Sequence, residues 1–282
     1  MKELNLRRHQ QSFSALGSDK DGPACNETFR YPSIIGMMMY LTGNSRPELA
    51  FSVHQCARFT HNPRASHEEA VQRIGRYLIG TRLKGLILRP DPKLGVEMFV
   101  DADFAGLWGF EDPTTPSSCR SRTGFVICLG GCPVLWKSTM QTEIASSTMH
   151  AEYIALSTAM RDLLPFRTQL KEQLEIVGLP SHKVAVIKTI IYEDNQGCQI
   201  LATSEPGRTT SNSKHFAVKW HWFREQLIPG EIVIVQIKTD KQLADIFTKG
   251  LRKILFETNR NDLCGWVARK HLECLQWRQE FF

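Results

Sequence analysis

The first third of the chain has the hydrophobic pattern of helices. Apolar residues recur every three or four positions in residues 34–41, 48–59 and 67–79, which predicts three helices. Residues 1–30 are polar and show no sustained period, so we expect a disordered leader there. A small helical segment over residues 31–90 is therefore expected to precede the main domain.

The middle of the chain changes to the pattern of strands. Residues 96–103 run apolar into an acidic pair, residues 123–129 are rich in β-forming side chains, and residues 133–137 follow a Gly-Gly turn. These features predict three antiparallel strands. Between the first two strands, residues 107–122 contain two prolines among serines and threonines, which is typical of an exposed loop.

Helical and strand patterns alternate in the second half. A helix is predicted to begin at Ser147 or Thr148 and to end at Gly178, with Pro165 either bending it or starting a second helix. The later elements are a buried strand at 184–192, a helix at 196–202, a basic helix ending near 229, a strand at 231–238 and a helix at 242–249. This order predicts an α/β domain over 95–266 and a tail over 267–282.

The composition is that of a globular protein. Of 282 residues, 42% are hydrophobic and 23% are charged, which excludes a disordered or fibrous chain. No apolar run approaches the roughly 18 residues needed to cross a bilayer, so no membrane partner is expected. With no secretory signal, the eight cysteines are expected to be reduced thiols in an intracellular protein.

One segment concentrates positive charge on a chain whose net charge is +6. Lys214, His215, Lys219, His221 and Arg224 alternate with aromatic residues. The pattern is that of an amphipathic helix with a solvated basic face. Contacts from that face to phosphates are the functional interpretation, and charge alone does not decide between the two.

Four acidic residues stand where elements end or begin. Asp101 ends the first strand and Asp194 follows the buried strand, while Glu152 and Asp245 lie early in their helices. A mixed sheet flanked by these helices would bring the four together. Such hard oxygen ligands suit Mg²⁺ or Mn²⁺, and two ions would serve attack at a phosphorus atom. The competing interpretation is structural, because acids are common at strand ends and in first helical turns.

Nine short motifs decide between these interpretations. They include Val100-Asp-Ala-Asp103, Ala151-Glu-Tyr153, Glu193-Asp-Asn-Gln196 and Leu243-Ala-Asp245. The full set occupies residues 31–42, 46–50, 76–81, 100–106, 121–126, 151–156, 193–196, 213–215 and 242–249. In this order the motifs closely resemble the C-terminal part of the pol polyprotein of copia-type retrotransposons, over about residues 31–266.

The resemblance implies a fold, an activity and its residues. The fold would be ribonuclease H-like, with three antiparallel strands, then parallel strands, and flanking helices. The helical segment would be the connection that follows a polymerase. The activity would be cleavage of the RNA strand of RNA:DNA hybrids with two Mg²⁺ or Mn²⁺ ions. The family's catalytic, metal-binding positions fall on Asp101, Glu152, Asp194 and Asp245.

The same resemblance suggests the substrate contacts and the partners. Asn195 and Gln196 would hydrogen-bond the minor groove and the 2′-hydroxyls that mark RNA, and Lys214 and His215 would hold the hybrid's backbone. The partners would be the hybrid and the rest of a retroelement pol, including its polymerase and integrase. The expected location is the cytoplasm, within a virus-like particle if the element is intact, with the nucleus as the alternative.

Two departures from the family keep alternatives open. Relatives usually carry glutamate at the position of His150, beside the catalytic glutamate, and the paired aspartates of a polymerase are absent. No DNA synthesis is therefore expected. The alternative function is a catalytically weak or silent remnant that binds nucleic acid non-specifically. Strand transfer of the integrase type would need its acids in the order Asp, Asp, Glu, whereas the order here is Asp, Glu, Asp, Asp.

Overall fold

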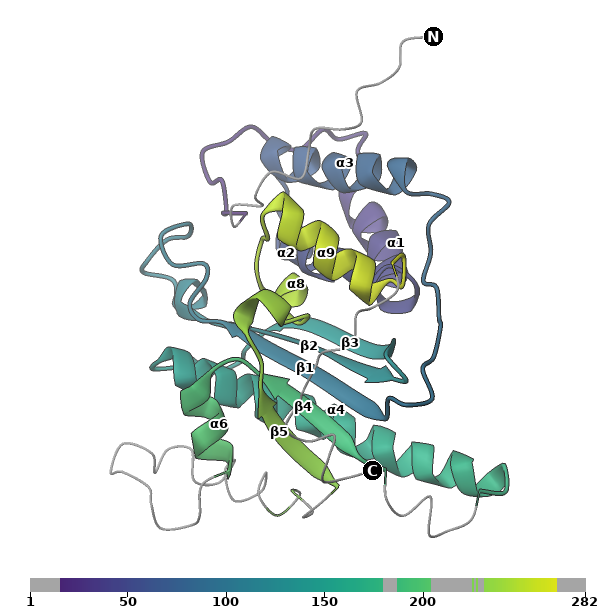
Figure 1. Ribbon diagram of the computed structural model, residues 1–282. Helices are drawn as coiled ribbons and strands as arrows, with labels where there is room; N and C mark the ends of the chain where they lie inside the picture. The colour runs from purple at the N-terminus through teal and green to yellow at the C-terminus, as the bar shows by residue number, and fades with distance from the viewer. Residues whose placement is uncertain (1–15, 180–186, 204–224, 226, 228–230, 268–282) are drawn as a thin grey trace.

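A five-stranded mixed sheet forms the centre of the molecule (Figure 1). The computed structural model describes residues 16–179, 187–203, 225, 227 and 231–267. The strands are β1 (Val96–Asp103), β2 (Arg122–Leu129), β3 (Cys132–Met140), β4 (Thr189–Glu193) and β5 (Ile232–Gln236). Their order in the sheet is β3-β2-β1-β4-β5, with β1 to β3 antiparallel and β4 and β5 parallel to β1. The predicted mixed sheet is confirmed.

Strand β1 is buried on both of its faces, which explains its almost continuous apolar run. Met98 packs into one hydrophobic cluster and Phe99 into another on the opposite face. The β2–β3 turn depends on Gly130 and Gly131, whose φ angles of 59° and 79° favour glycine. The sheet therefore needs a covering layer on each face.

Helices cover both faces of the sheet (Figure 1). One face packs against α4 (Thr148–Ile176) and α6 (Gln196–Thr203), and the other against α8 (Asp245–Thr248) and α9 (Lys253–Leu263). Helix α4 continues through Pro165, so no second helix begins there. Its buried residues lie between Ala151 and Arg167 and include Ala155 and Leu163.

The amino-terminal helices form a small core of their own and also contact the sheet. They are α1 (Tyr31–Asn44), α2 (Ala50–Ala57) and α3 (Ala65–Gly80). The indole Nε1 of Trp136 in β3 donates to the carbonyl of Thr42 at 2.6 Å, and the Arg122 guanidinium lies over the Phe51 ring. The helical segment predicted from the sequence thus lies against the domain on the side of α8 and α9 (Figure 1).

Several predicted boundaries differ from the structure. Residues 16–30, predicted as part of a leader, lie against α3, because the Asn26 N–H donates to Glu68 at 3.0 Å and Ala24 pairs with Arg64. The last predicted helix is reduced to α8, and α9 was not predicted. Short 3-10 helices occur at Pro47–Leu49, Pro116–Cys119 and Thr239–Lys241. The predicted basic helix and tail lie outside the described residues, except for residues 225, 227 and 267.

None of the helices in the described residues is both long enough and apolar enough to cross a membrane.

Candidate metal centre

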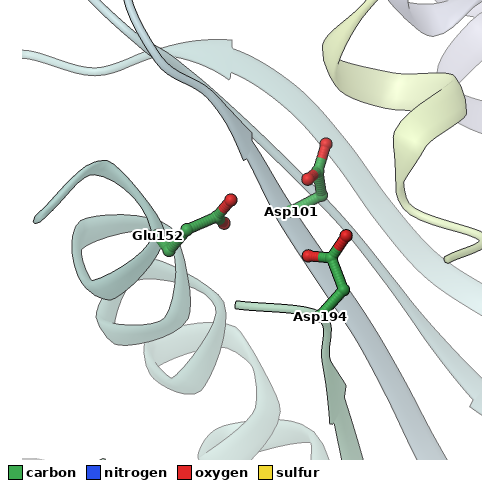
Figure 2. Close-up of side chains that lie close together, drawn as sticks. All are labelled: Asp101, Glu152 and Asp194. Atoms are coloured by element: carbon green, nitrogen blue, oxygen red, sulfur yellow. The ribbon is translucent and has the colours of Figure 1, made fainter. Parts of the chain in front are cut away.

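Three predicted acids meet at one edge of the sheet. Asp101 lies near the end of β1, Asp194 follows β4, and Glu152 lies in the first turns of α4. Phe99 in β1 pairs with Tyr192 in β4, and Asp101 and Asp194 each lie two residues further along the chain. The parallel pairing therefore brings these two acids to the same edge of the sheet. Figure 2 shows the three side chains pointing toward one another. The register of β1 and β4 thus brings Asp101 close to Asp194, although the two residues are far apart in the sequence.

The three carboxylates have the chemistry and spacing of a divalent-cation site. One oxygen from each of Asp101, Glu152 and Asp194 lies within 4.8 Å of the others. Glu152 is 4% exposed, and its Oε2 is buried with no hydrogen-bond partner. Buried carboxylate oxygens are rarely left unsatisfied, and hard oxygen donors suit Mg²⁺ or Mn²⁺. The residues present therefore fit the predicted metal.

Burial and like charge both act against ionisation in this cluster. Burial is the main reason that the pKa of Glu152 is raised well above its usual range, and Glu193, Asp101 and Asp194 raise it further. Burial and the charge of Asp101 also raise the pKa of Asp194. The cluster is an excess of negative charge, which a bound cation would neutralise.

The fourth predicted acid, Asp245, lies beside the cluster at the start of α8. Lys249 pairs with it at 2.8 Å, and the same ammonium lies 3.6 Å from Asp101. Burial raises the pKa of Asp245 to about 7, with a contribution from Asp101, while Lys249 acts in the opposite direction. The Thr248 hydroxyl donates to Asp101 Oδ2. Helix α8 thus brings an acid, a hydroxyl and a cation to one side of Asp101.

The close approach of α8 requires a glycine in the sheet. Gly124 pairs with Asp101 across β1 and β2. A Cβ at Gly124 would lie 2.6 Å from Thr248 Cγ2 and 2.7 Å from Phe247 Cβ. Such contacts are shorter than side chains tolerate, so a larger residue would force α8 away from Asp101.

The predicted substrate-binding residues have different outcomes. Asn195 Oδ1 accepts from the Cys198 N–H at 2.9 Å, at the start of α6, so this oxygen stabilises the helix end. Gln196 is exposed next to Asp194. Lys214 and His215 lie outside the described residues.

His150 takes part in the beginning of α4. Ser147 is the N-cap, and its hydroxyl accepts from the His150 N–H at 3.1 Å. The His150 Nδ1 accepts from the Ser146 N–H at 3.0 Å. In a capping box, a glutamate at the third helical position accepts from the N–H of the N-cap residue, whereas the His150 imidazole accepts from the residue before the N-cap. His150 therefore links the chain that precedes α4 to the first turn of the helix.

Four further side chains at the site were not predicted. Glu193 is buried next to Asp194, and its pKa is raised to about 8, chiefly by burial. Thr239 donates to Asp194 at 2.9 Å, while Thr248 and Lys249 contact Asp101. Glu193, Thr248 and Lys249 stand inside the family motifs, which is the signal that pointed to them. Thr239 stands outside these motifs.

Comparisons with known proteins show polyprotein relatives. The chain is 30% identical over 250 residues to the Retrovirus-related Pol polyprotein from transposon RE2 of Arabidopsis thaliana, covering 85% of this chain. It is 31% identical over 242 residues to that from transposon TNT 1-94 of Nicotiana tabacum, covering 86%. The chain spans 16% of the length of each. No family model matches the chain.

Among solved structures, the chain is similar to the ribonuclease H1 LC11, isolated from compost by a metagenomic approach. The TM-score is 0.39 at 18% identity, over 55% of this chain and 92% of the other.

Proposed function

Since the chain belongs with the Pol polyproteins of copia-type retrotransposons, we propose that it is their ribonuclease H part and hydrolyses the RNA strand of RNA:DNA hybrids. The observation that supports this most is the convergence of Asp101, Glu152 and Asp194, because three of the four predicted acids offer oxygens within 4.8 Å of one another. The order of strands matches the fold expected for that activity.

The residues divide into those that would hold metal and those that orient them. Asp101, Glu152 and Asp194 would hold a divalent cation, and Asp101 with Asp245 a second. Two such ions activate water and stabilise the leaving oxygen in an in-line attack at phosphorus. The hydroxyls of Thr248 and Thr239 donate to Asp101 and Asp194, which orients these carboxylates. Hydrogen bonds that fix the orientation of ligating carboxylates strengthen metal sites.

Contacts to the substrate are also part of the proposal. Gln196, exposed beside Asp194, would reach the minor groove of the hybrid, and the Asn195 amide nitrogen would assist it. Lys214 and His215 would bind the backbone. The rest of the polyprotein would be the partner, in the cytoplasm or in the virus-like particle of an intact element.

A cleavage assay tests the proposal. A labelled RNA:DNA hybrid is incubated with Mg²⁺ and either the wild type, Asp194→Asn or the control Asp162→Asn, whose aspartate pairs with Lys137 at 3.5 Å outside the cluster. We expect cleavage by the wild type and by the control, and its loss in Asp194→Asn. Equal inertness of all three proteins would overturn the proposal. Salt-sensitive binding of the hybrid without cleavage would support the silent remnant instead.

A further inference from the structure

Lys249 holds a position between two acids of the proposed metal site. Its ammonium lies 2.8 Å from Asp245 Oδ1 and 3.6 Å from Asp101 Oδ2. The pair with Asp245 spans one helical turn, whereas Asp101 lies on β1 in the centre of the sheet. One cation therefore bridges an acid of α8 and an acid of the three-carboxylate cluster.

Burial makes this bridge important for the metal-free protein. The side chains of Asp101 and Asp245 are each 2% exposed, whereas that of Lys249 is 37% exposed. Buried carboxylates are costly unless a cation or hydrogen bonds compensate them. The Lys249 ammonium, at 2.8 Å and 3.6 Å from two buried carboxylates, supplies that cation. Its partial exposure leaves it room to move toward solvent.

The negative charge of the Asp101–Glu152–Asp194 side and that of the Asp101–Asp245 side of the site are neutralised in different ways. Among the described residues, the acids that offer converging ligand atoms are Asp101, Glu152 and Asp194, and Asp245 is not in that group. Asp245 is instead the acid nearest to Lys249. Glu152 Oε2 and Asp245 Oδ1 are both buried oxygens without a hydrogen-bond partner, but Asp245 Oδ1 forms an ion pair with Lys249. One half is thus open to a cation, and the other is held by the chain's own cation.

We propose that Lys249 is a built-in counter-cation that occupies the Asp101–Asp245 side and competes with a divalent cation there. This inference rests on the proposed function, because it concerns the same metal site. The first cation would bind Asp101, Glu152 and Asp194 without displacing Lys249. The second would bind Asp101 and Asp245 only as the ammonium moves away, and its binding would be weaker.

Metal titration of the full-length protein tests this independently of activity. Binding of Mn²⁺ is followed by calorimetry and by the electron paramagnetic resonance of the free ion. The proteins are the wild type, Lys249→Met, Lys249→Arg and the control Lys137→Met, whose lysine pairs with Asp162. Lys249→Gln repeats the charge removal with a side chain that still donates a hydrogen bond, in case Lys249→Met does not fold.

We expect removal of the charge to tighten the second binding event about tenfold, because the cation no longer meets a competing positive charge. Lys249→Arg and Lys137→Met should bind like the wild type. Unchanged affinity and stoichiometry in both Lys249→Met and Lys249→Gln would overturn the inference while leaving the proposed function intact. Absence of Mn²⁺ binding in every protein would overturn both.

Discussion

Helix α4 carries a buried charged residue near its beginning and another in its second half, and each meets groups at one end of β4. Near the end of β4, Glu152 meets Asp101 and Asp194 in a cluster of acids. Near its start, the Arg167 guanidinium donates to the Ile187 carbonyl, to the Thr189 hydroxyl and to Glu231. Neighbouring segments of one domain thus hold a cluster of like charges and a cluster in which opposite charges pair with one another.

The two clusters differ in whether their charged groups have partners of opposite charge within the chain. Lys171 joins Arg167 around Glu231 at 3.2 Å, so every charged group of the second cluster has a partner of opposite sign. The carboxylate cluster keeps an unpartnered oxygen on Glu152 and raised pKa values. A buried site that the protein itself leaves unbalanced is a site prepared for a ligand of opposite charge.

We expect the largest effect on cleavage from Glu152→Gln, in the carboxylate cluster. The amide removes a metal ligand, and we expect cleavage of the hybrid to fall roughly 100- to 1,000-fold. In contrast, the metal-free variant should be at least as stable as the wild type, because a neutral group replaces one whose ionisation is opposed by burial and like charge. Cleavage rates and urea unfolding without metal measure the two effects. A large loss of stability would show that Glu152 holds the fold together.

Arg167→Met should have the opposite result. Removal of the guanidinium leaves the Ile187 carbonyl without this donor and Glu231 with Lys171 as its remaining ion-pair partner, and we expect a loss of about 3 kcal/mol in the free energy of unfolding. Cleavage per folded molecule should stay within about twofold, because the cluster lies away from the carboxylates. Urea unfolding and an active-fraction assay provide the measurements. An unchanged midpoint would contradict the structural role of this cluster.

Stability and Mg²⁺ binding at the carboxylate cluster should both depend on pH. The pKa of Glu193 is raised to about 8 and that of Asp245 to about 7, chiefly by burial. The folded chain therefore binds more protons than the unfolded chain, and the stability from these groups is lost as pH rises from about 5 to 8. Mg²⁺ needs ionised carboxylates, so the rise in melting temperature that it causes should be larger at about pH 8.5 than at pH 6.

Melting curves with and without Mg²⁺ measure this at both pH values, with Asp194→Asn as the variant lacking a ligand. An equal rise at both pH values would indicate that Mg²⁺ binds outside the carboxylate cluster.

His150→Glu should have the smallest effect. Glutamate is the side chain expected here from the family resemblance, and at the third helical position it would accept from the N–H of the N-cap, Ser147, in place of the imidazole contact with the Ser146 N–H. We expect the free energy of unfolding to change by less than about 0.5 kcal/mol and cleavage to change less than about threefold. Thermal unfolding and hybrid cleavage are the measurements. A large gain in cleavage would instead assign His150 to the weakening of the site, as the silent-remnant alternative holds.

The local elements and the four acids of the site could be predicted from the sequence alone. The apolar run before Asp101 predicted β1 with its observed bounds, Val96–Asp103, and Ser147 was one of the two residues at which α4 was predicted to begin. These features depend on neighbours in the chain, namely on hydrophobic period and capping chemistry. The motifs then supplied the family and the mixed sheet.

Which side chains lie together at the site depends on the tertiary structure. Lys249 and Asp101 are far apart in the sequence, and no local period joins them. They meet because Gly124 lets α8 pack tightly against the sheet. The contact of His150 with the Ser146 N–H depends on the path of the backbone before α4. The charge balance around a buried acid depends on every element packed against it, so the acids could be predicted from the sequence whereas their counter-cation could not.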